Sequence, residues 1–180
     1  MCLLAPACAR PERTWQPPQD PAAFDDTTFL HYLTTVPWAT NGETVRAILL
    51  LDETARPVEP SDLNRAVPAN EVLPTSFSDR VAALSARGAV RAVWRLRENE
   101  LVDRGTVAYM IRHVCRLSPS INERLFGSWG VGERRFALQT CVDAGLIDYG
   151  PAHEPVSGGE LLAIITRAAD YLEGREDDPG

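Results

Sequence analysis

One pattern occurs twice in this chain of 180 residues, and it limits the folds that the chain can adopt. In residues 76–93, SFSDRVAALSARGAVRAV, a helix-forming run stops at Gly88 and small apolar residues follow. Residues 132–150, GERRFALQTCVDAGLIDYG, stop in the same way at Gly145. Glycine adopts positive φ angles without a steric penalty, which is what a chain reversal past a helix end requires. The sequence therefore predicts two similar units in which a helix ends at glycine and a short strand begins.

Each unit also contains an earlier helix and a shorter one. In the first unit, Thr40 and Glu43 form a capping-box signature before TVRAILLLDE, and a short helix is expected over residues 61–67. In the second unit, Asp103 is in the N-cap position of DRGTVAYMIRHVCRL, and SPSINERLF has its proline where a helix begins. Strands are predicted over residues 91–97 and 146–149, although the first of these also fits a continued helix.

The two units have segments of different composition on either side. Residues 1–23 contain five of the 14 prolines, so we expect a disordered or loosely attached arm. A helix is then predicted from Asp25 to the residue before Pro37. The expected division of the chain is residues 24–99 for this helix and the first unit, 100–150 for the second unit, and 151–180 for a C-terminal helix with an acidic tail.

The C-terminal helix has a capping-box signature at Ser157 and Glu160 and an apolar stripe at helical spacing. The stripe consists of Leu161, Ile164, Ile165, Ala168 and Leu172. It could bind a protein partner or a second copy of the chain, or it could fold back and cover the core of the two units. The second interpretation is slightly favoured, because two tandem units do not need a partner to form a pseudo-twofold arrangement.

The order of helix, short helix, turn, longer helix, glycine and strand resembles the winged helix-turn-helix superfamily. The phrases RVAALSARGAV and ALQTCVDAGLI are similar to the end of a recognition helix entering the wing of bacterial winged-helix regulators. The resemblance covers about residues 40–150 and identifies no single family. It implies a mainly α fold with short β wings, in which two tandem winged helix-turn-helix units lie between flanking N- and C-terminal helices. It also implies DNA binding through the longer helix of each unit.

The net charge of −7 is confined to the two ends of the chain. Residues 1–43 have a net charge of −3 and residues 151–180 of −5, whereas residues 44–99 have +1 and residues 100–150 have zero. All 18 basic residues are arginine. Because the middle of the chain is neutral, DNA binding would have to use local clusters of arginine.

The proposed recognition helix of the second unit provides Arg134, Arg135 and Gln139. These side chains are long enough to reach phosphates and base edges in a major groove. An equally weighted interpretation is that the two arginines are solvated or pair with Glu133 and Asp143.

The first unit provides a weaker set of candidates. Ser76, Ser78 and Arg80 take the equivalent places on its helix, where the nearby Asp79 would repel phosphate. The wing would add three arginines that could follow a minor groove or a DNA backbone. They are Arg91, Arg95 and Arg97. The alternative is a surface strand neutralised by acidic residues just beyond it, with Trp94 facing the core.

No catalytic, metal or membrane motif is found. The four cysteines and three histidines have no zinc-site spacing, no cofactor motif is present, and no apolar run is long enough to span a membrane. We therefore predict a cytoplasmic, non-enzymatic protein that binds duplex DNA without a cofactor, such as a transcriptional regulator or a component of a plasmid, phage or defence system. The alternative is a protein-interaction adaptor built on the same tandem units.

Overall fold

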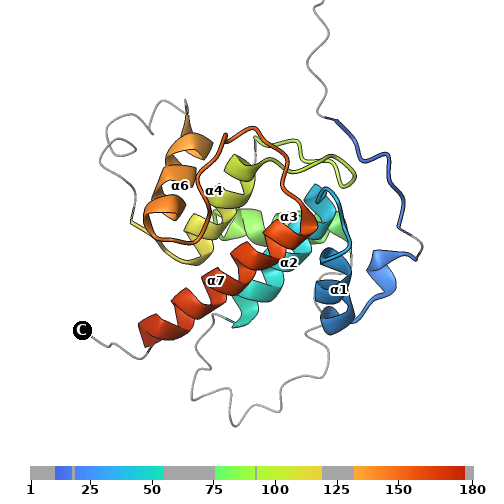
Figure 1. The fold of residues 1–180 in the computed structure, drawn as a ribbon, viewed down its shortest axis with the longest axis horizontal. Coiled ribbons are helices and arrows are strands. Elements are labelled where there is room, and N and C mark those ends of the chain that lie inside the picture. The colour runs from blue at the N-terminus through green and yellow to red at the C-terminus, as the bar shows by residue number, and fades with distance from the viewer. Residues whose placement is uncertain (1–10, 18, 55–75, 92, 119–131, 177–180) are drawn as a thin grey trace, which may run out of the picture.

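The computed structural model describes residues 11–17, 19–54, 76–91, 93–118 and 132–176. This part of the chain is mainly helical, as the sequence predicts. A short 3-10 helix, η1 (Pro21–Ala23), is followed by six α-helices. They are α1 (Asp26–Leu33), α2 (Asn41–Thr54), α3 (Phe77–Ala86), α4 (Arg104–Val114), α6 (Glu133–Asp143) and α7 (Gly158–Glu176). Figure 1 shows α2, α4 and α7 in the middle of the fold, with α1 and α6 on opposite sides.

The helices begin where the sequence provides capping side chains. Asp25 accepts a hydrogen bond from the N–H of Thr28 at 3.0 Å, and Asp103 accepts one from the N–H of Thr106 at 2.7 Å. Such bonds satisfy amide groups that have no partner within the helix. Helix α6 differs, because its N-cap residue is Gly132, which has a φ of 85° and no side chain to accept a hydrogen bond.

Helices α3 and α6, one in each unit, end in the same way. The backbone φ is +76° at Gly88, after α3, and +72° at Gly145, after α6. The residue after each glycine donates its N–H to a buried residue of the preceding helix at 2.9 Å: Ala89 to Leu84, and Leu146 to Cys141. The chain reversals predicted at the two glycines are therefore present, and they are built from the same hydrogen bonds.

Three distant segments meet in a closed ring of backbone hydrogen bonds, which we call the three-segment junction. Ala39 donates its N–H to the carbonyl of Val156 at 2.8 Å, Val156 donates to Val102 at 3.2 Å, and Val102 donates to Ala39 at 3.0 Å. All three residues have an exposed fraction of 0%. Each lies two residues before a helix, since α2, α4 and α7 begin at Asn41, Arg104 and Gly158. The junction thereby fixes the starting points of the three central helices.

In each unit, the first turn of the first helix donates backbone hydrogen bonds to the loop at the end of that unit. The spacing of the bonded residues is the same in α2 and α4. The N–H groups of Asn41 and Gly42 donate to the carbonyls of Glu100 and Glu98 at 2.9 and 3.0 Å. In the second unit the pairs are Arg104 with Glu154 at 2.9 Å, and Gly105 with Ala152 at 2.8 Å. A Cβ atom at Gly105 would lie 3.1 Å from the carbonyl oxygen of Ala152, so the missing side chain allows the close approach of the loop there. The internal repeat thus extends to individual hydrogen bonds.

The apolar stripe of α7 lies in the core of the chain itself. Leu161, Ile164, Ile165 and Ala168 are buried, and Leu172 is partly buried against the same core. Helix α7 contacts α1, α2 and α4. Of the two interpretations of this helix, the intramolecular one is therefore confirmed, and the stripe is not available for a partner.

The predicted strands are not found in the described residues. Side chains alternate between exposed and half-buried from Val93 to Arg97, as in a strand, but no strand pairs with this segment. One reason is that a neighbouring backbone group is used elsewhere: the carbonyl of Arg97 accepts from the side-chain amide of Asn41 at 2.9 Å. Residues 146–149 also form no strand: the N–H groups of Leu146 and Ile147 both donate to the carbonyl of Cys141, at 2.9 and 3.4 Å, in the chain reversal after α6. The described part of the chain contains isolated bridges and no sheet.

Part of the predicted N-terminal arm is packed against the body of the protein. The carbonyl of Pro11 accepts from the N–H of Leu101 at 3.0 Å, and the N–H of Arg13 donates to the carbonyl of Asn99 at 3.1 Å. The rest of the arm up to residue 10 lies outside the described residues, as do the short helices predicted over residues 61–67 and in SPSINERLF from residue 119 onwards.

Candidate nucleic-acid interface

The loop after α3 lies against the N-terminal end of α6, so the structure brings together residues that the sequence assigned to different units. Arg91 forms an ion pair with Glu133, the first residue of α6. The guanidinium carbon of Arg134 lies 4.5 Å from the ring centroid of Trp94, a cation–π contact. The predicted wing of the first unit thus adjoins the predicted recognition helix of the second.

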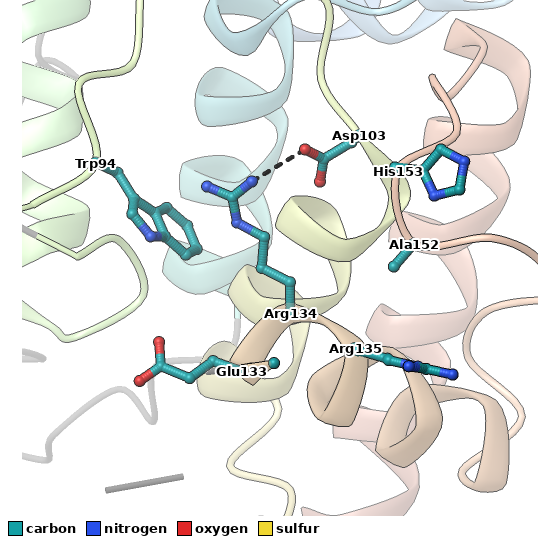
Figure 2. Close-up of a pocket in the computed structure, with 8 residues that line it drawn as sticks. Trp94, Asp103, Glu133, Arg134, Arg135, Ala152 and His153 are labelled. Carbon is teal, nitrogen blue, oxygen red and sulfur yellow. Dashed lines mark hydrogen bonds and ion pairs between the residues drawn. The ribbon is translucent and has the colours of Figure 1, made fainter. Parts of the chain in front are cut away.

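A pocket of about 440 Å³ opens at this contact. It is lined by Trp94, Asp103, Gly132, Glu133, Arg134, Arg135, Ala152 and His153. Figure 2 shows Arg134 in the middle, reaching towards Asp103, with Trp94 on one side and His153 on the other, while Arg135 points away from Arg134. The pocket has charges of both signs, and both of its carboxylates are paired with arginine.

Two of the predicted DNA-binding arginines have structural roles. Arg134 donates to Asp103 at 3.1 Å, and its side chain is only 30% exposed. Since Asp103 also caps α4, this ion pair ties the start of α6 to the start of α4. Arg91 ties the loop to α6 through Glu133 in the same way. We therefore treat Arg134 and Arg91 as residues that position the surface.

The other candidates in this region are at the surface. Arg135 and Gln139 are exposed on α6, whose opposite side buries Ala137, Leu138 and Cys141 against the core. The side-chain nitrogen of Gln139 donates to the carboxylate of Asp143 at 2.7 Å.

The loop contributes two further exposed cations. Arg95 is exposed, and the side chain of Arg97 is 73% exposed with carboxylate oxygens of Glu100 and Glu12 at 3.8 and 4.0 Å. Ion pairs of this length that involve an exposed arginine contribute little to stability.

The candidates on α3 belong to a different environment. The side chain of Ser76 caps α3 by accepting from the N–H of Asp79 at 3.1 Å, and Ser78 is exposed. Arg80 is half-buried, and burial together with the charge of Arg46 lowers its pKa. The carboxylates that act on Arg80 are Glu98 and Asp26, which belong to other elements than α6. Of these carboxylates, Glu98 follows Arg97 in the loop and Asp26 begins α1, so Arg80 lies between the loop and α1.

A column of aromatic rings beside the pocket was not identified from the sequence. The ring centroids of Trp94 and Tyr109 are 4.8 Å apart, and those of Tyr109 and His113 are 4.3 Å apart. Nδ1 of His113 lies 2.9 Å from the carbonyl oxygen of Tyr109. The available signal was the spacing of Tyr109 and His113, four residues apart on one helix face. Trp94 is at the end of this column, and Arg134 lies over its ring. The column therefore connects α4, the loop and α6.

His113 should make the stability of this region depend on pH. Burial, followed by the charges of Arg112 and Arg91, lowers the pKa of His113 below its usual 6.5. The unfolded chain therefore binds more protons just below pH 6.5, and the free energy of unfolding should decrease as the pH falls from about 7.5 to 5.5. Urea unfolding of the wild type and of His113→Gln at these two pH values measures the effect. An equal pH dependence in both chains would exclude His113 as its source.

Two cysteines of the described residues are buried. Burial raises the pKa of both Cys115 and Cys141 to about 12, as for thiols that pack in a core. Within the same ranges, no group of three or more potential metal ligands is found. No helix there is long and apolar enough to cross a membrane.

Comparison with protein-family models, curated proteins and solved structures found no significant match to this chain.

Proposed function

We propose that the chain is a non-enzymatic DNA-binding protein built on two tandem winged helix-turn-helix units. Support comes from the repeated register of hydrogen bonds, in which the first turn of α2 and that of α4 each hold the loop that closes the unit. In both units a helix (α2 or α4) comes first, and a later helix (α3 or α6) ends at a positive-φ glycine and is followed by a returning loop. These would be the first and the last of the three helices of a winged-helix unit; the short helix expected between them falls largely outside the described residues, and loops take the place of the β wings.

The observation that most favours DNA is the position of the exposed arginines. Arg135 and Gln139 lie on the exposed side of α6, and Arg95 and Arg97 lie on the loop that packs against the start of that helix. In the proposed complex, Arg135 and Gln139 contact a groove while Arg95 and Arg97 contact phosphates. Arg134 and Arg91 act indirectly, because their ion pairs hold the loop and α6 together.

The test is binding to random-sequence duplex DNA over a series of salt concentrations. Removal of one arginine that binds a phosphate should reduce the slope of log affinity against log salt by about 1. We therefore expect Arg95→Ala/Arg97→Ala to lower the salt slope by about 2, and Arg135→Ala to weaken binding further. Circular dichroism should show that these variants remain folded, since the replaced side chains are exposed.

Arg116→Ala is the matched control. Arg116 is exposed and follows the C-terminal end of α4, whereas Asp103 and its partner Arg134 lie at the N-terminal end of that helix. The control variant should bind DNA with the salt slope of the wild type. Equal affinities for the wild type and the variants of Arg95, Arg97 and Arg135 would contradict the proposed interface.

An adaptor function is favoured by a different observation. The loops after α3 and α6 each expose one large apolar side chain: Val93 is 76% exposed and Tyr149 is 85% exposed. Contiguous apolar patches mark sites that bind another protein, so this second function requires that the two side chains contribute to one such patch. If the wild type does not bind DNA even at low salt, a pull-down with the wild type and with Val93→Ser/Tyr149→Ser would test this second function.

A further inference from the structure

The docked part of the N-terminal arm, residues 11–17, places a carboxylate beside one of the proposed DNA-binding arginines. Glu12 and Glu100 form an antiparallel bridge, and the backbone hydrogen bonds of Pro11 and Arg13 lie on either side of it. Figure 1 shows this segment outside the helices, on the side of α1. Glu12 therefore has a fixed position at the edge of the loop after α3.

The two side chains of this bridge lie on the same face and have the same charge. The hydrogen bonds join the residues before and after the bridge, so Glu12 and Glu100 form a non-hydrogen-bonded pair, in which opposing side chains are closest. Like charges directly opposite each other are unfavourable. Nη1 of Arg97 lies 4.0 Å from Oε1 of Glu12, and its Nε lies 3.8 Å from Oε1 of Glu100. The two carboxylates therefore share Arg97 as a cation.

The arm is held in place by contacts that do not involve Arg97. Glu43 has an exposed fraction of 5%, and its Oε1 accepts hydrogen bonds from Arg13 and, at 2.6 Å, from the hydroxyl of Tyr32. The ring of Trp15 stacks on that of Tyr32, with 6.4 Å between the centroids. These contacts fix the backbone of the arm, so its carboxylate stays beside Arg97 without depending on a strong bond to it.

From these contacts we infer that the docked arm inhibits DNA binding, because Glu12 competes with a phosphate for Arg97. A phosphate that binds the 73% exposed side chain of Arg97 comes close to the carboxylate of Glu12, and it draws the shared cation away from Glu12 and Glu100. Both effects raise the free energy of the complex. The inference rests on the proposed DNA-binding function and adds a regulation of the same surface. Because linkage is reciprocal, bound DNA weakens the docking of the arm by the same factor.

The first experiment compares the affinities of variants for random-sequence duplex DNA. Glu12→Gln removes the charge and keeps the backbone bonds of the arm, and folding should not change because the side chain is 63% exposed. Glu173→Gln is the matched control, since this exposed residue near the end of α7 changes the net charge equally. At low salt we expect Glu12→Gln to bind about threefold more tightly than the wild type and the control. The difference should shrink as the salt concentration rises, because exposed charges are screened.

Two further measurements test the competition itself. In an Arg97→Ala background, Glu12→Gln should change the affinity no more than Glu173→Gln does. Hydrogen exchange measures the reciprocal effect on the amides of Arg13 and Leu101, which donate the bonds on either side of the bridge. Bound DNA should make these amides exchange about threefold faster, whereas a direct contact with DNA would protect them. Unchanged or slower exchange would overturn the inference.

The possible results separate the inference from the function on which it rests. If the wild type binds DNA and Arg97→Ala weakens binding, but Glu12→Gln behaves like Glu173→Gln, the inference is overturned and the proposed function stands. A gain in affinity that persists without Arg97 would also overturn it, because the charge would then not act by competition. If no variant binds DNA even at low salt, both the inference and the proposed function fail.

Discussion

Replacing Gly158 by alanine is expected to lower the free energy of unfolding by about 3 kcal/mol, the upper end of the usual cost of overpacking. Gly158 is the first residue of α7, and its N–H donates to the carbonyl of Val36 at 3.0 Å. A Cβ atom there would lie 2.2 Å from the carbonyl oxygen of Leu33 and 2.7 Å from Cβ of Val36. Both neighbours belong to or follow α1, so α7 would have to move away from that helix. Urea denaturation followed by circular dichroism measures the change.

The neighbouring glycine offers a matched control. A Cβ atom at Gly159 would have no atom within 4 Å. Gly159→Ala should therefore be neutral or stabilising by up to about 1 kcal/mol, because alanine favours the helix more than glycine does. If the two alanine variants had the same stability, the close packing of α7 against α1 would not explain the requirement at Gly158.

Replacing Glu43 by alanine is expected to cost about 3–5 kcal/mol, the range measured when one partner of a buried ion pair is removed. The exposed fraction of the side chain of Arg13 is 12%. Besides the bonds from Arg13 and Tyr32, the carboxylate accepts the N–H of Thr40 at 2.9 Å. Burial, followed by the hydrogen bond to Glu43, raises the pKa of Tyr32, which therefore stays a donor at all ordinary pH values. The alanine variant would leave all three donors without this acceptor.

Glu43→Gln separates the charge from the hydrogen bonds. The amide oxygen can still accept from Thr40 or Tyr32, so this variant should lose less stability than Glu43→Ala. The part of the loss due to the ion pair is obtained from a double-mutant cycle with Arg13→Gln. A loss below about 0.5 kcal/mol for Glu43→Ala, the size of a typical surface substitution, would contradict the structural role of this carboxylate.

The features predicted correctly depend on residues close together in the sequence. The capping residues Asp25 and Asp103, the reversals at Gly88 and Gly145, and the buried stripe of α7 each require only one helix and its ends. Helix periodicity and cap chemistry are local properties, so one sequence is enough to identify them.

The features that were missed depend on partners far away in the chain. Residues 93–97 alternate like a strand, but whether a strand forms depends on the groups that bind their backbone, and one of these is the side chain of Asn41. Arg134 has the length and charge of a DNA ligand, yet it pairs with Asp103, the cap of another helix. No local pattern contains that information.

One non-local feature did leave a readable signal. Each segment of the three-segment junction has an apolar residue, a capping residue and, two positions further, a glycine. The three copies are Ala39-Thr40-Asn41-Gly42, Val102-Asp103-Arg104-Gly105 and Val156-Ser157-Gly158-Gly159. The sequence therefore contains a motif that occurs three times at helix starts, in addition to the motif that occurs twice at helix ends. The first of these motifs marks the residues of the three-segment junction.

The three-segment junction makes each repeat depend on the other for folding. Ala39 belongs to the first repeat, but its amide is bound by a carbonyl that follows the second repeat, and the ring closes only through Val102 between them. A cut between the repeats would leave each piece with a buried amide or carbonyl without its partner, which a folded protein rarely tolerates. We therefore expect that neither repeat folds when it is expressed alone.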